Sequence, residues 1–334
     1  MEKIKISFVL AILNADRTLE DCLNGILLQD YPSEHYEVII VDGGSTDATL
    51  NIVGSYKKKI RNLKLIKNPN KLSEGRGMGK DLGIKKSKGE FIVLLDHDNL
   101  IYDKKWLEKM LYPFNDKNIM ASQSMLEYKD SDPIFLKYIN AIGVEDAFAI
   151  PYSLVSQATI YPTRFKLIHN KYYACKLDPK NVLFGGANGC IFRRRVFKII
   201  RGYTRDVNVS ASMAEHNMVF AIVKDAKLHH KTGSSFWKFF KKKIVYFNRF
   251  LTYGFKEENF KWVPSELSGK LRFGLRVFAN LTLIMPSLFG LRQCLKTKKL
   301  FWLMHPFYLF SMTLAYGIIT LLKIKNYFIY LRKK

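Results

Sequence analysis

The stretch from Glu90 to Asn99 constrains the fold most, because an apolar run ends there on two carboxylates. Phe91 to Leu95 is an uninterrupted apolar run with β-branched members and is too short for a helix, so we predict a buried strand. Asp96 and Asp98 follow it, with one residue between them. Ligands in an open α/β sheet bind beyond the carboxyl ends of the strands. The pair is a candidate site for Mg²⁺ or Mn²⁺ carrying a diphosphate, and the alternative is a simple strand cap.

Strands and helices are predicted to alternate before this stretch. Further strands are expected at residues 5–12, 36–41 and 63–67, with helical spacing at Leu19 to Leu27 and a glycine-rich basic helix from Glu74 to Lys86. Such alternation predicts a mostly parallel sheet with right-handed crossovers, flanked by helices. Asp42 ends the second strand, so we expect it at the same edge of the sheet as Asp96.

The segment Gly75-Arg76-Gly77-Met78-Gly79-Lys80 leaves two interpretations open. The glycines could allow close packing of a helix on the sheet. Alternatively, they could let the backbone approach a phosphate while Arg76 or Lys80 supplies positive charge. The spacing is neither that of a P-loop nor that of a dinucleotide-binding fingerprint.

Composition narrows the class of protein. A hydrophobic content of 48% in 334 residues supports a large core and argues against disorder. The net charge of +25 suggests nucleic acid, an anionic membrane or a phosphate-bearing substrate as partner. The cysteines have no metal-type spacing and are expected to be buried thiols in a reducing compartment. The first residues lead into a strand without a signal-like apolar core, so we expect the catalytic part in the cytoplasm.

The N-terminal motifs, taken in order, resemble the nucleotide-sugar half of family 2 glycosyltransferases, which have the GT-A fold. The strand at 5–12, the turn at 41–47, the glycine-rich helix and residues 88–98 carry the resemblance, which covers roughly residues 4–232. It implies that Asp42 holds the nucleotide base, that Asp96 and Asp98 contact ribose and metal, and that the donor site also contains the residues Ala11, Asn14, Arg76 and Lys80. Three positions depart from the family pattern: Ala11 stands where Pro is usual, Gly43 where a second Asp is usual, and Asp81 where Asn is common. These departures leave the identity of the bound nucleotide undetermined.

The same resemblance assigns the second half to the acceptor. Residues 184–194 are similar to the family's glycine-rich turn and strand, which implies acceptor contacts at Gly186, Ala187 and Asn188. A strand at 117–123, a helix at 132–148 and a mobile acceptor loop at 150–180 are also expected, an irregular surface excursion being the alternative for the loop.

The resemblance also implies a general base on the helix after Gly202-Tyr203. Counting back about nineteen residues from the turn Val223-Lys224-Asp225-Ala226 gives Asp206, with an ordinary helix N-cap as the alternative interpretation and Glu215 as the fallback base. Asn217, which tolerates a left-handed helix end, supports this register. By resemblance, His230 on a short strand joins Asp96 and Asp98 in the metal site; a structural histidine is the alternative.

The C-terminal part mixes aromatic, apolar and basic residues. Residues 236–243 suit a helix lying on an anionic bilayer, whereas residues 273–290 and 300–322 are longer apolar runs. Basic flanks at both ends of these runs strain the positive-inside rule for a crossing, and Arg276 and Pro286 interrupt the first run. We therefore expect interfacial or re-entrant helices, with a buried helical subdomain or a dimer interface as the alternative.

These inferences predict an inverting, metal-dependent glycosyltransferase that transfers one sugar from a nucleotide-sugar to a lipid-linked or glycan acceptor in surface-glycan assembly. Residues 1–235 would form the GT-A domain (1–127 donor half, 128–235 acceptor half), and residues 236–334 the membrane-associated helices. The absence of Gln-x-x-Arg-Trp near Phe236 to Arg249 argues against processive transfer. The alternatives are a polyprenyl-phosphate sugar synthase, a non-catalytic sugar-nucleotide-binding membrane partner and, disfavoured, a nucleic-acid-binding protein.

Overall fold

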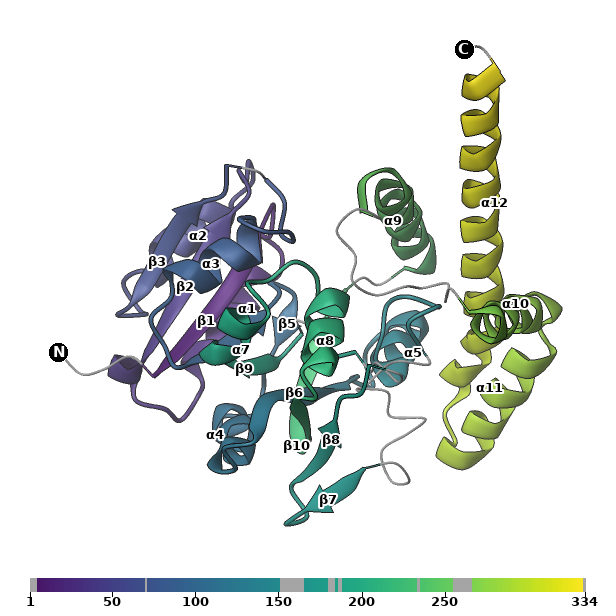
Figure 1. Ribbon diagram of the computed structural model, residues 1–334. Helices are drawn as coiled ribbons and strands as arrows, with labels where there is room; N and C mark the ends of the chain where they lie inside the picture. The colour runs from purple at the N-terminus through teal and green to yellow at the C-terminus, as the bar shows by residue number, and fades with distance from the viewer. Residues whose placement is uncertain are drawn as a thin grey trace. The chain divides into compact units, whose positions relative to one another are not determined.

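The computed structural model describes residues 5–69, 71–150, 165–179, 184–185, 188–232, 235–254 and 266–332 (Figure 1). The chain is divided into two compact units. Unit 1 comprises Met1–Tyr128 and Tyr152–Lys231, and unit 2 comprises Lys129–Pro151 and Thr232–Lys334. The domain boundaries expected from the sequence, 1–235 and 236–334, stay a prediction. The two units differ from these domains because they group Lys129–Pro151 with the C-terminal helices.

Unit 1 is built on a sheet that has ten strands in the described part of the chain, in the order β3-β2-β1-β4-β9-β6-β10-β8-β7, with β5 paired to β10. The strands are β1 Ile6–Ile12, β2 Tyr36–Asp42, β3 Leu63–Lys67, β4 Phe91–Leu95, β5 Asn99–Leu100, β6 Ile119–Glu127, β7 Lys166–Ile168, β8 Tyr172–Lys176, β9 Cys190–Arg193 and β10 Val219–His230. The first four in this order pair in parallel, β9 is antiparallel to both β4 and β6, and β6 pairs in parallel with β10. The expected α/β sheet is thus confirmed, and the strands from β3 to β4 in this order are parallel as predicted. The sheet as a whole is mixed, because β9, β8, β7 and β5 pair antiparallel with their neighbours.

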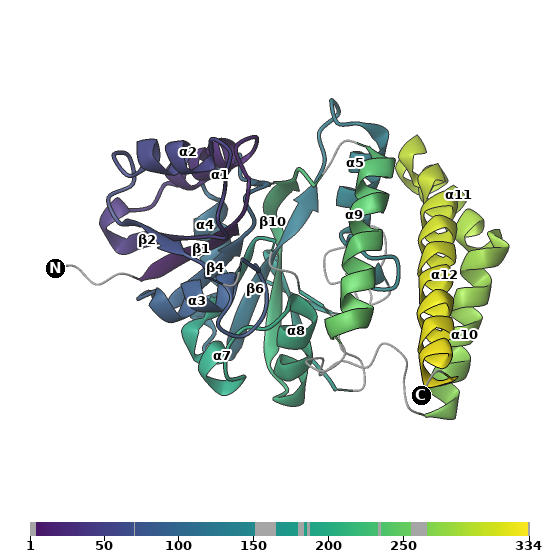
Figure 2. The ribbon, with the colours of Figure 1, turned by 90° about the horizontal axis from the view of Figure 1, so that it is seen from above.

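Helices cover both faces of this sheet, which explains why β1 and β2 are buried along their whole length. The helices are α1 Leu19–Leu27, α2 Thr49–Tyr56, α3 Gly79–Lys86, α4 Trp106–Leu111, α7 Arg194–Ile199 and α8 Asp206–Glu215. Figure 2 shows α1 and α2 on one face and α3, α7 and α8 on the other. Side chains of α1, α2 and α4 form the main core with alternate residues of β1, including Phe8 and Leu10.

The glycine-rich segment shows the close packing that the sequence offered as one interpretation, and the approach to a phosphate stays a prediction. The predicted helix at 74–86 begins only at Gly79, because Gly75 and Gly77 adopt positive φ angles of 123° and 72° that favour glycine. Gly79 serves packing, since a Cβ there would lie 2.7 Å from the Cβ of Ala11 on β1. The turn at 74–78 therefore faces the carboxyl edge of the sheet from the start of α3.

Several predicted elements of the second half need correction. Residues 166–176 form the hairpin β7–β8 rather than part of a long loop, and residues 151–164 and 180 of that predicted loop lie outside the described residues. The predicted turn at 223–226 is a bulge inside β10, so His230 ends a long strand and not a short one. The predicted helix at 132–148 is shorter, α5 Ile134–Ile142, because Gly143 takes a left-handed conformation (φ 78°) at its end.

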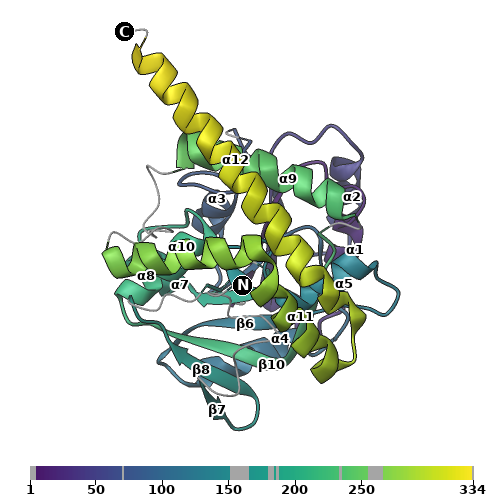
Figure 3. The ribbon, with the colours of Figure 1, turned by 90° about the vertical axis from the view of Figure 1, so that its right-hand side faces the viewer.

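Unit 2 consists of helices: α5, α9 Phe236–Arg249, α10 Leu267–Thr282, α11 Ile284–Thr297 and α12 Met304–Arg332. Both α10 and α11 pack on α12, as Figure 3 shows. The loop after α5 is tied to this bundle, because Tyr308 donates a hydrogen bond to the carbonyl of Glu145 (2.6 Å) and Tyr316 to the carboxylate of Asp146 (2.9 Å). Lys243 of α9 forms an ion pair with Glu145 at 2.7 Å. These contacts explain why Lys129–Pro151 belongs to unit 2.

The predicted apolar run at 273–290 is broken at Leu283, where α10 and α11 meet at an angle of 71°. The helical segment Leu300–Ile324 is long and apolar enough to cross a membrane. No other single helix among the described residues meets both conditions. Of the four cysteines, Cys22, Cys175 and Cys190 are buried as expected, and Cys294 is partly exposed; all four are free thiols.

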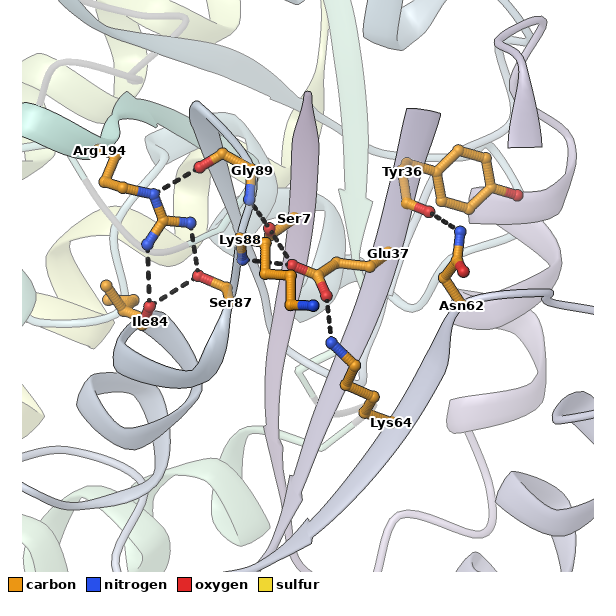
Figure 4. A network of polar contacts seen from close by, with 10 residues as sticks. All are labelled: Ser7, Tyr36, Glu37, Asn62, Lys64, Ile84, Ser87, Lys88, Gly89 and Arg194. Atoms are coloured by element: carbon orange, nitrogen blue, oxygen red, sulfur yellow. Dashed lines mark hydrogen bonds and ion pairs between the residues drawn. The ribbon is translucent and has the colours of Figure 1, made fainter. Parts of the chain in front are cut away.

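A polar network fixes the amino-terminal edge of the sheet, opposite the predicted site (Figure 4). The buried carboxylate of Glu37 accepts hydrogen bonds from Ser7 Oγ (2.8 Å), the Lys88 amide (2.5 Å) and Lys64 Nζ (2.8 Å). Arg194 at the start of α7 donates to the carbonyl of Gly89 at 2.6 Å. Burial alone would raise the pKa of Glu37, but these hydrogen bonds and the charge of Lys64 lower it below its ordinary value.

Replacing Glu37 by Gln should destabilise unit 1 by about 2 kcal/mol at neutral pH. The two carboxylate oxygens of Glu37 accept hydrogen bonds from three donors, and in Gln an NH₂ group would replace one of these oxygens and face a donor. The effect stays this small because the Lys64 side chain is 44% exposed and its charge is screened. Because folding lowers the pKa of Glu37, its carboxylate stabilises the folded state at pH values above the unfolded-state pKa. This stabilisation is lost as the pH falls through the folded-state pKa. The deficit in stability should therefore shrink below about pH 4.5, the ordinary glutamate pKa. Denaturant unfolding at several pH values measures the free energy of unfolding of each variant, and Glu90→Gln, which changes an exposed carboxylate, is the control. A free energy of unfolding unchanged in Glu37→Gln would contradict the prediction.

Candidate active site

Three acidic side chains lie at the carboxyl edge of the parallel strands. Asp42 is the last residue of β2, and Asp96 and Asp98 follow β4 directly. β1 separates β2 from β4 and pairs in parallel with both, so both strand ends point to the same side. The structure thus brings these predicted residues to one edge of the sheet, where ligands of open α/β sheets bind.

The carboxylate of Asp42 organises the turn that follows it. It accepts hydrogen bonds from the amides of Gly44 (2.9 Å) and Ser45 (3.1 Å) and from Ser45 Oγ (2.6 Å). Asn14, with a φ of 50°, ties the loop after β1 to the same turn, because its Oδ1 accepts from the amide of Thr46 at 2.9 Å. Asn14 therefore lies beside the turn that Asp42 organises, whereas Ala11 is opposite Val41 in the sheet and packs under Gly79.

Lys80 is buried at the start of α3 among carboxylates. Its Nζ lies 3.0 Å from Asp96 Oδ1 and 3.7 Å from Glu74 Oε1, and only 3% of its side chain is exposed. Burial would lower the pKa of Lys80, but the charges of Asp96, Asp206 and Glu74 raise it above its ordinary value, so the ammonium stays charged. Arg76, the other predicted cation, lies exposed on the preceding turn.

Asp98 and His230 come together because β5 pairs with the end of β10. Asn99 is opposite His230 in this pairing, and His230 Nε2 lies 3.3 Å from Asp98 Oδ1. A carboxylate and an imidazole, 14% and 6% exposed, are suitable donors for Mn²⁺ or Mg²⁺. Asp96 instead faces Lys80, and within the described residues no three His, Cys, Asp or Glu side chains are grouped closely enough to hold a metal ion. Asp98 and His230 would hold a divalent cation only together with further ligands, such as diphosphate oxygens and water.

Asp206 is the first residue of α8, and its carboxylate accepts a hydrogen bond from the Tyr203 hydroxyl at 2.5 Å. The N-cap is Arg205, and no side-chain hydrogen bond caps the helix, so the N-cap interpretation of Asp206 is wrong. Glu215, the fallback base, is exposed at the opposite end of α8, about 14 Å along the axis. Asn217 has a φ of 50°, as its predicted place at a left-handed helix end requires.

Asn188 lies close to this edge of the sheet. Asn99 Nδ2 donates to Asn188 Oδ1 at 2.9 Å, and Gln123 Nε2 donates to the Asn188 carbonyl at 2.7 Å. Gly186 and Ala187, the other predicted acceptor residues, lie outside the described residues. Because Asn99 is only three residues after Asp96 in the chain, its contact with Asn188 brings the predicted acceptor turn to the segment that follows β4.

Sequence reasoning missed Glu74 and Tyr203, which connect the predicted residues. The Tyr203 hydroxyl lies 3.3 Å from Glu74 Oε1 as well as 2.5 Å from Asp206 Oδ1. Asp81, noted only as a departure from the family pattern, accepts hydrogen bonds from the amides of Tyr203 (2.8 Å) and Gly77 (2.7 Å). A continuous series of contacts therefore runs from Asp206 through Tyr203, Glu74 and Lys80 to Asp96. The available signal was Glu74 itself, an acid at the start of the predicted basic glycine-rich helix.

The mixed sheet, its flanking helices and the acidic edge define the GT-A fold. The chain belongs to glycosyl transferase family 2, whose sequence pattern matches residues 7–200. Two solved structures share the fold at low identity. The mannosyltransferase PcManGT from Pyrobaculum calidifontis, in complex with GDP-Man and Mn²⁺, has a TM-score of 0.55, 14% identity and coverage of 95% of this chain and 88% of that one. S. aureus TarS 1–349 in complex with UDP-GlcNAc has a TM-score of 0.51, 15% identity and coverage of 94% and 91%.

Curated relatives match only in part. The poly(ribitol-phosphate) beta-glucosyltransferase of Bacillus spizizenii is 36% identical over 115 residues, which are 34% of this chain and 18% of that protein. Glycosyltransferase GlyG of Streptococcus pneumoniae is 27% identical over 179 residues, 50% of this chain and 58% of that protein. The match with each of these two relatives thus covers less than two thirds of the relative's length.

Proposed function

We propose that this chain is an inverting glycosyltransferase that moves one sugar from a nucleotide-sugar donor to the hydroxyl of a lipid-linked or glycan acceptor. The observation that carries the proposal is the contact series from Asp206 to Asp96, which joins a candidate base to the strand-end carboxylates. Family membership and solved relatives bound to GDP-Man or UDP-GlcNAc support a sugar nucleotide as donor.

Each residue has a stated task in this proposal. Asp42 and Asn14 shape the nucleotide pocket, and Asp96 faces the ribose. Lys80 offers positive charge to the diphosphate in exchange for its contact with Asp96, and Arg76 on the preceding turn supplies a second positive charge. Asp206 takes the proton of the acceptor hydroxyl as that oxygen attacks the anomeric carbon from the side opposite the diphosphate, which inverts the configuration.

Asp98 and His230 would hold a divalent cation, with Asp96 joining them if Lys80 moves to the diphosphate. A bound Mn²⁺ or Mg²⁺ would neutralise charge on the leaving diphosphate. The solved relative that contains both GDP-Man and Mn²⁺ supports this assignment. Gly186, Ala187 and Asn188 are proposed to contact the acceptor.

The test is hydrolysis of a panel of UDP- and GDP-sugars by the detergent-solubilised full chain, with Mn²⁺ or with EDTA. Turnover of one donor that stops with EDTA is expected. Metal-dependent nucleotide binding without turnover in any acceptor-free or acceptor-supplemented assay would favour a non-catalytic sugar-nucleotide-binding partner. Polyprenyl phosphate and lipid-linked oligosaccharide, added as acceptors, separate the polyprenyl-phosphate sugar synthase from the glycan-assembly enzyme.

We further propose that unit 2 holds the chain at the cytoplasmic face of a membrane, with α10 and α11 lying in the interface. Exposed apolar residues recur along one face of each helix: Leu267, Leu271, Leu275 and Phe278 on α10, and Ile284, Leu288, Leu291 and Leu295 on α11. Exposed basic residues such as Lys270 and Arg272 accompany them and suit anionic headgroups. The bend of 71° between α10 and α11 is compatible with interfacial or re-entrant helices.

The triple variant Leu271→Ser, Leu275→Ser, Phe278→Ser should weaken binding to phosphatidylcholine–phosphatidylglycerol vesicles at least tenfold, since each side chain loses about 1.5–3 kcal/mol of apolar burial. Flotation of the vesicles with the purified chain measures the bound fraction of each variant. The matched control replaces the exposed Leu28, Leu50 and Leu65 of unit 1 by Ser. Equal binding by both triple variants would rule out the α10 face as a lipid contact.

A further inference from the structure

The hydroxyl of Tyr203 lies between two carboxyl groups of unit 1. It donates to Asp206 Oδ1 at 2.5 Å and lies 3.3 Å from Glu74 Oε1. These groups come from the start of α8 and from the turn before α3, which are distant in sequence. One hydroxyl hydrogen can serve one carboxylate at a time, so the second contact is satisfied when Glu74 carries a proton and donates it to the phenolic oxygen.

Tyr203 is held firmly in this position. Its side chain is fully buried, its amide donates to Asp81 Oδ1 at 2.8 Å, and Lys80 Nζ lies 5.8 Å from its ring centroid. Asp81 also accepts from the amide of Gly77 at 2.7 Å, so one carboxylate ties Tyr203 to the turn that carries Glu74. The phenol of Tyr203 and the carboxyl group of Glu74 are therefore held close to each other by contacts that do not involve Asp206.

We propose that Tyr203 and Glu74 form a proton relay that empties Asp206 after each sugar transfer, an inference that rests on the proposed function. As the acceptor oxygen bonds to the anomeric carbon and the carbon–diphosphate bond breaks, the acceptor proton passes to Asp206 and the bonding pair leaves on the diphosphate. Asp206 then gives a proton to the phenolic oxygen while the hydroxyl hydrogen of Tyr203 moves to Glu74 Oε1. Glu74, with 36% of its side chain exposed, releases the proton to water.

The electrostatics of the cluster support these roles. Partial burial raises the pKa of Glu74, and the negative charges of Asp206 and Asp96 raise it further. The positive charges of Lys80 and Arg205 oppose this rise, which leaves the pKa of Glu74 at about 7. A group with that pKa both accepts and releases a proton near neutral pH. Burial, together with the charges of Asp206 and Glu74, raises the pKa of Tyr203 well above its ordinary value, so the phenol stays neutral and can pass a proton on without ionising.

The first test measures protonation without needing turnover. A ¹³C-carboxyl NMR titration of the full chain in detergent, with the Glu74 signal assigned by its loss in Glu74→Gln, should give half-titration near pH 7 in wild type. Asp206→Asn should lower that midpoint by about one pH unit, because a neighbouring negative charge is removed. Titration of Glu74 near its ordinary value of 4.5, unaffected by Asp206→Asn, would overturn the relay.

The second test uses the pH profile of donor hydrolysis, with water as acceptor and the UDP- and GDP-sugar panel as probe. Wild-type turnover should rise with pH through about 7, as Glu74 becomes able to receive a proton. Glu74→Gln and Tyr203→Phe should each remove that rise and slow turnover about tenfold, with donor affinity unchanged and the double variant no slower than either single one. Glu90→Gln, an exposed carboxylate outside the cluster, is the matched control.

The outcomes separate the relay from the proposed function. Wild-type hydrolysis with an unchanged rate and profile in Glu74→Gln would overturn the relay and leave the glycosyltransferase intact. Absence of hydrolysis of every donor, together with Glu74 titrating near 7 and responding to Asp206→Asn, would overturn the proposed activity while supporting the coupling of the two carboxyl groups.

Discussion

Replacing Asp206 by Asn should lower donor turnover about 10³-fold, within the range that a general base contributes. Asn has nearly the same shape, and its Oδ1 can still accept the hydrogen bond from the Tyr203 hydroxyl, so the start of α8 should keep its structure. The amide cannot take the acceptor proton, however. Because Asp206 acts on the acceptor and not on the nucleotide, donor affinity should change less than about threefold. Nucleotide release and calorimetric donor binding measure the two quantities separately.

The matched control for this experiment is Glu215→Gln, which changes the exposed carboxylate at the far end of the same helix. It should leave turnover near that of wild type. The reverse result, with turnover lost in Glu215→Gln and kept in Asp206→Asn, would make Glu215 the base. Insensitivity to both changes in a chain that binds donor would favour the non-catalytic alternative.

Replacing Asp98 by Ala should abolish the stimulation of donor hydrolysis by Mn²⁺ and lower turnover about 10³-fold, because metal-assisted charge neutralisation amounts to several kcal/mol. The carboxylate lies 3.3 Å from His230 Nε2, and its loss leaves the imidazole without its acidic neighbour in the proposed metal site. Electron paramagnetic resonance of Mn²⁺ in the presence of UDP or GDP should show weaker metal binding, which is a readout independent of turnover.

His230→Gln should weaken Mn²⁺ binding in the same assay, since an amide is a poorer metal ligand than an imidazole. Asp130→Ala is the control, because that carboxylate is 94% exposed and lies in the other unit. Wild-type Mn²⁺ binding in Asp98→Ala would remove Asp98 and His230 from the metal site. Wild-type turnover in EDTA would make the transferase metal-independent.

Local patterns in the sequence were enough for the donor half of the sheet. The strands β3 and β4 have the predicted bounds, and β2 ends on Asp42. The apolar runs of β2 and β4 are bounded by polar residues and have few alternatives to a buried parallel strand. The edge strand β3 has no buried residue, and its apolar residues are interrupted by lysines. Asn217 was predictable for a similar reason: few residues tolerate the left-handed conformation at a helix end. The resemblance to the family also followed from motifs that are contiguous in the chain.

The second half was less predictable because its structure depends on long-range pairing. The segment 223–226 has the composition of a turn, yet pairing of β10 with β6 on both sides of it makes it a bulge within a strand. Lys129–Pro151 reads as a continuation of the acceptor half, but Tyr308, Tyr316 and Lys243 bind its loop from helices far along the chain. Neither outcome is encoded in local composition.

The sequence by itself therefore determined the family, the parallel donor half and the acidic residues at its edge, since each of these depends on neighbours in the chain. Only the tertiary structure decided how those residues are connected. Tyr203 and Glu74 are 129 positions apart and meet at 3.3 Å, and Lys80 turns to Asp96 rather than to solvent. Such contacts, and the protonation states they impose, arise from burial and distance in the folded chain, which no local pattern specifies.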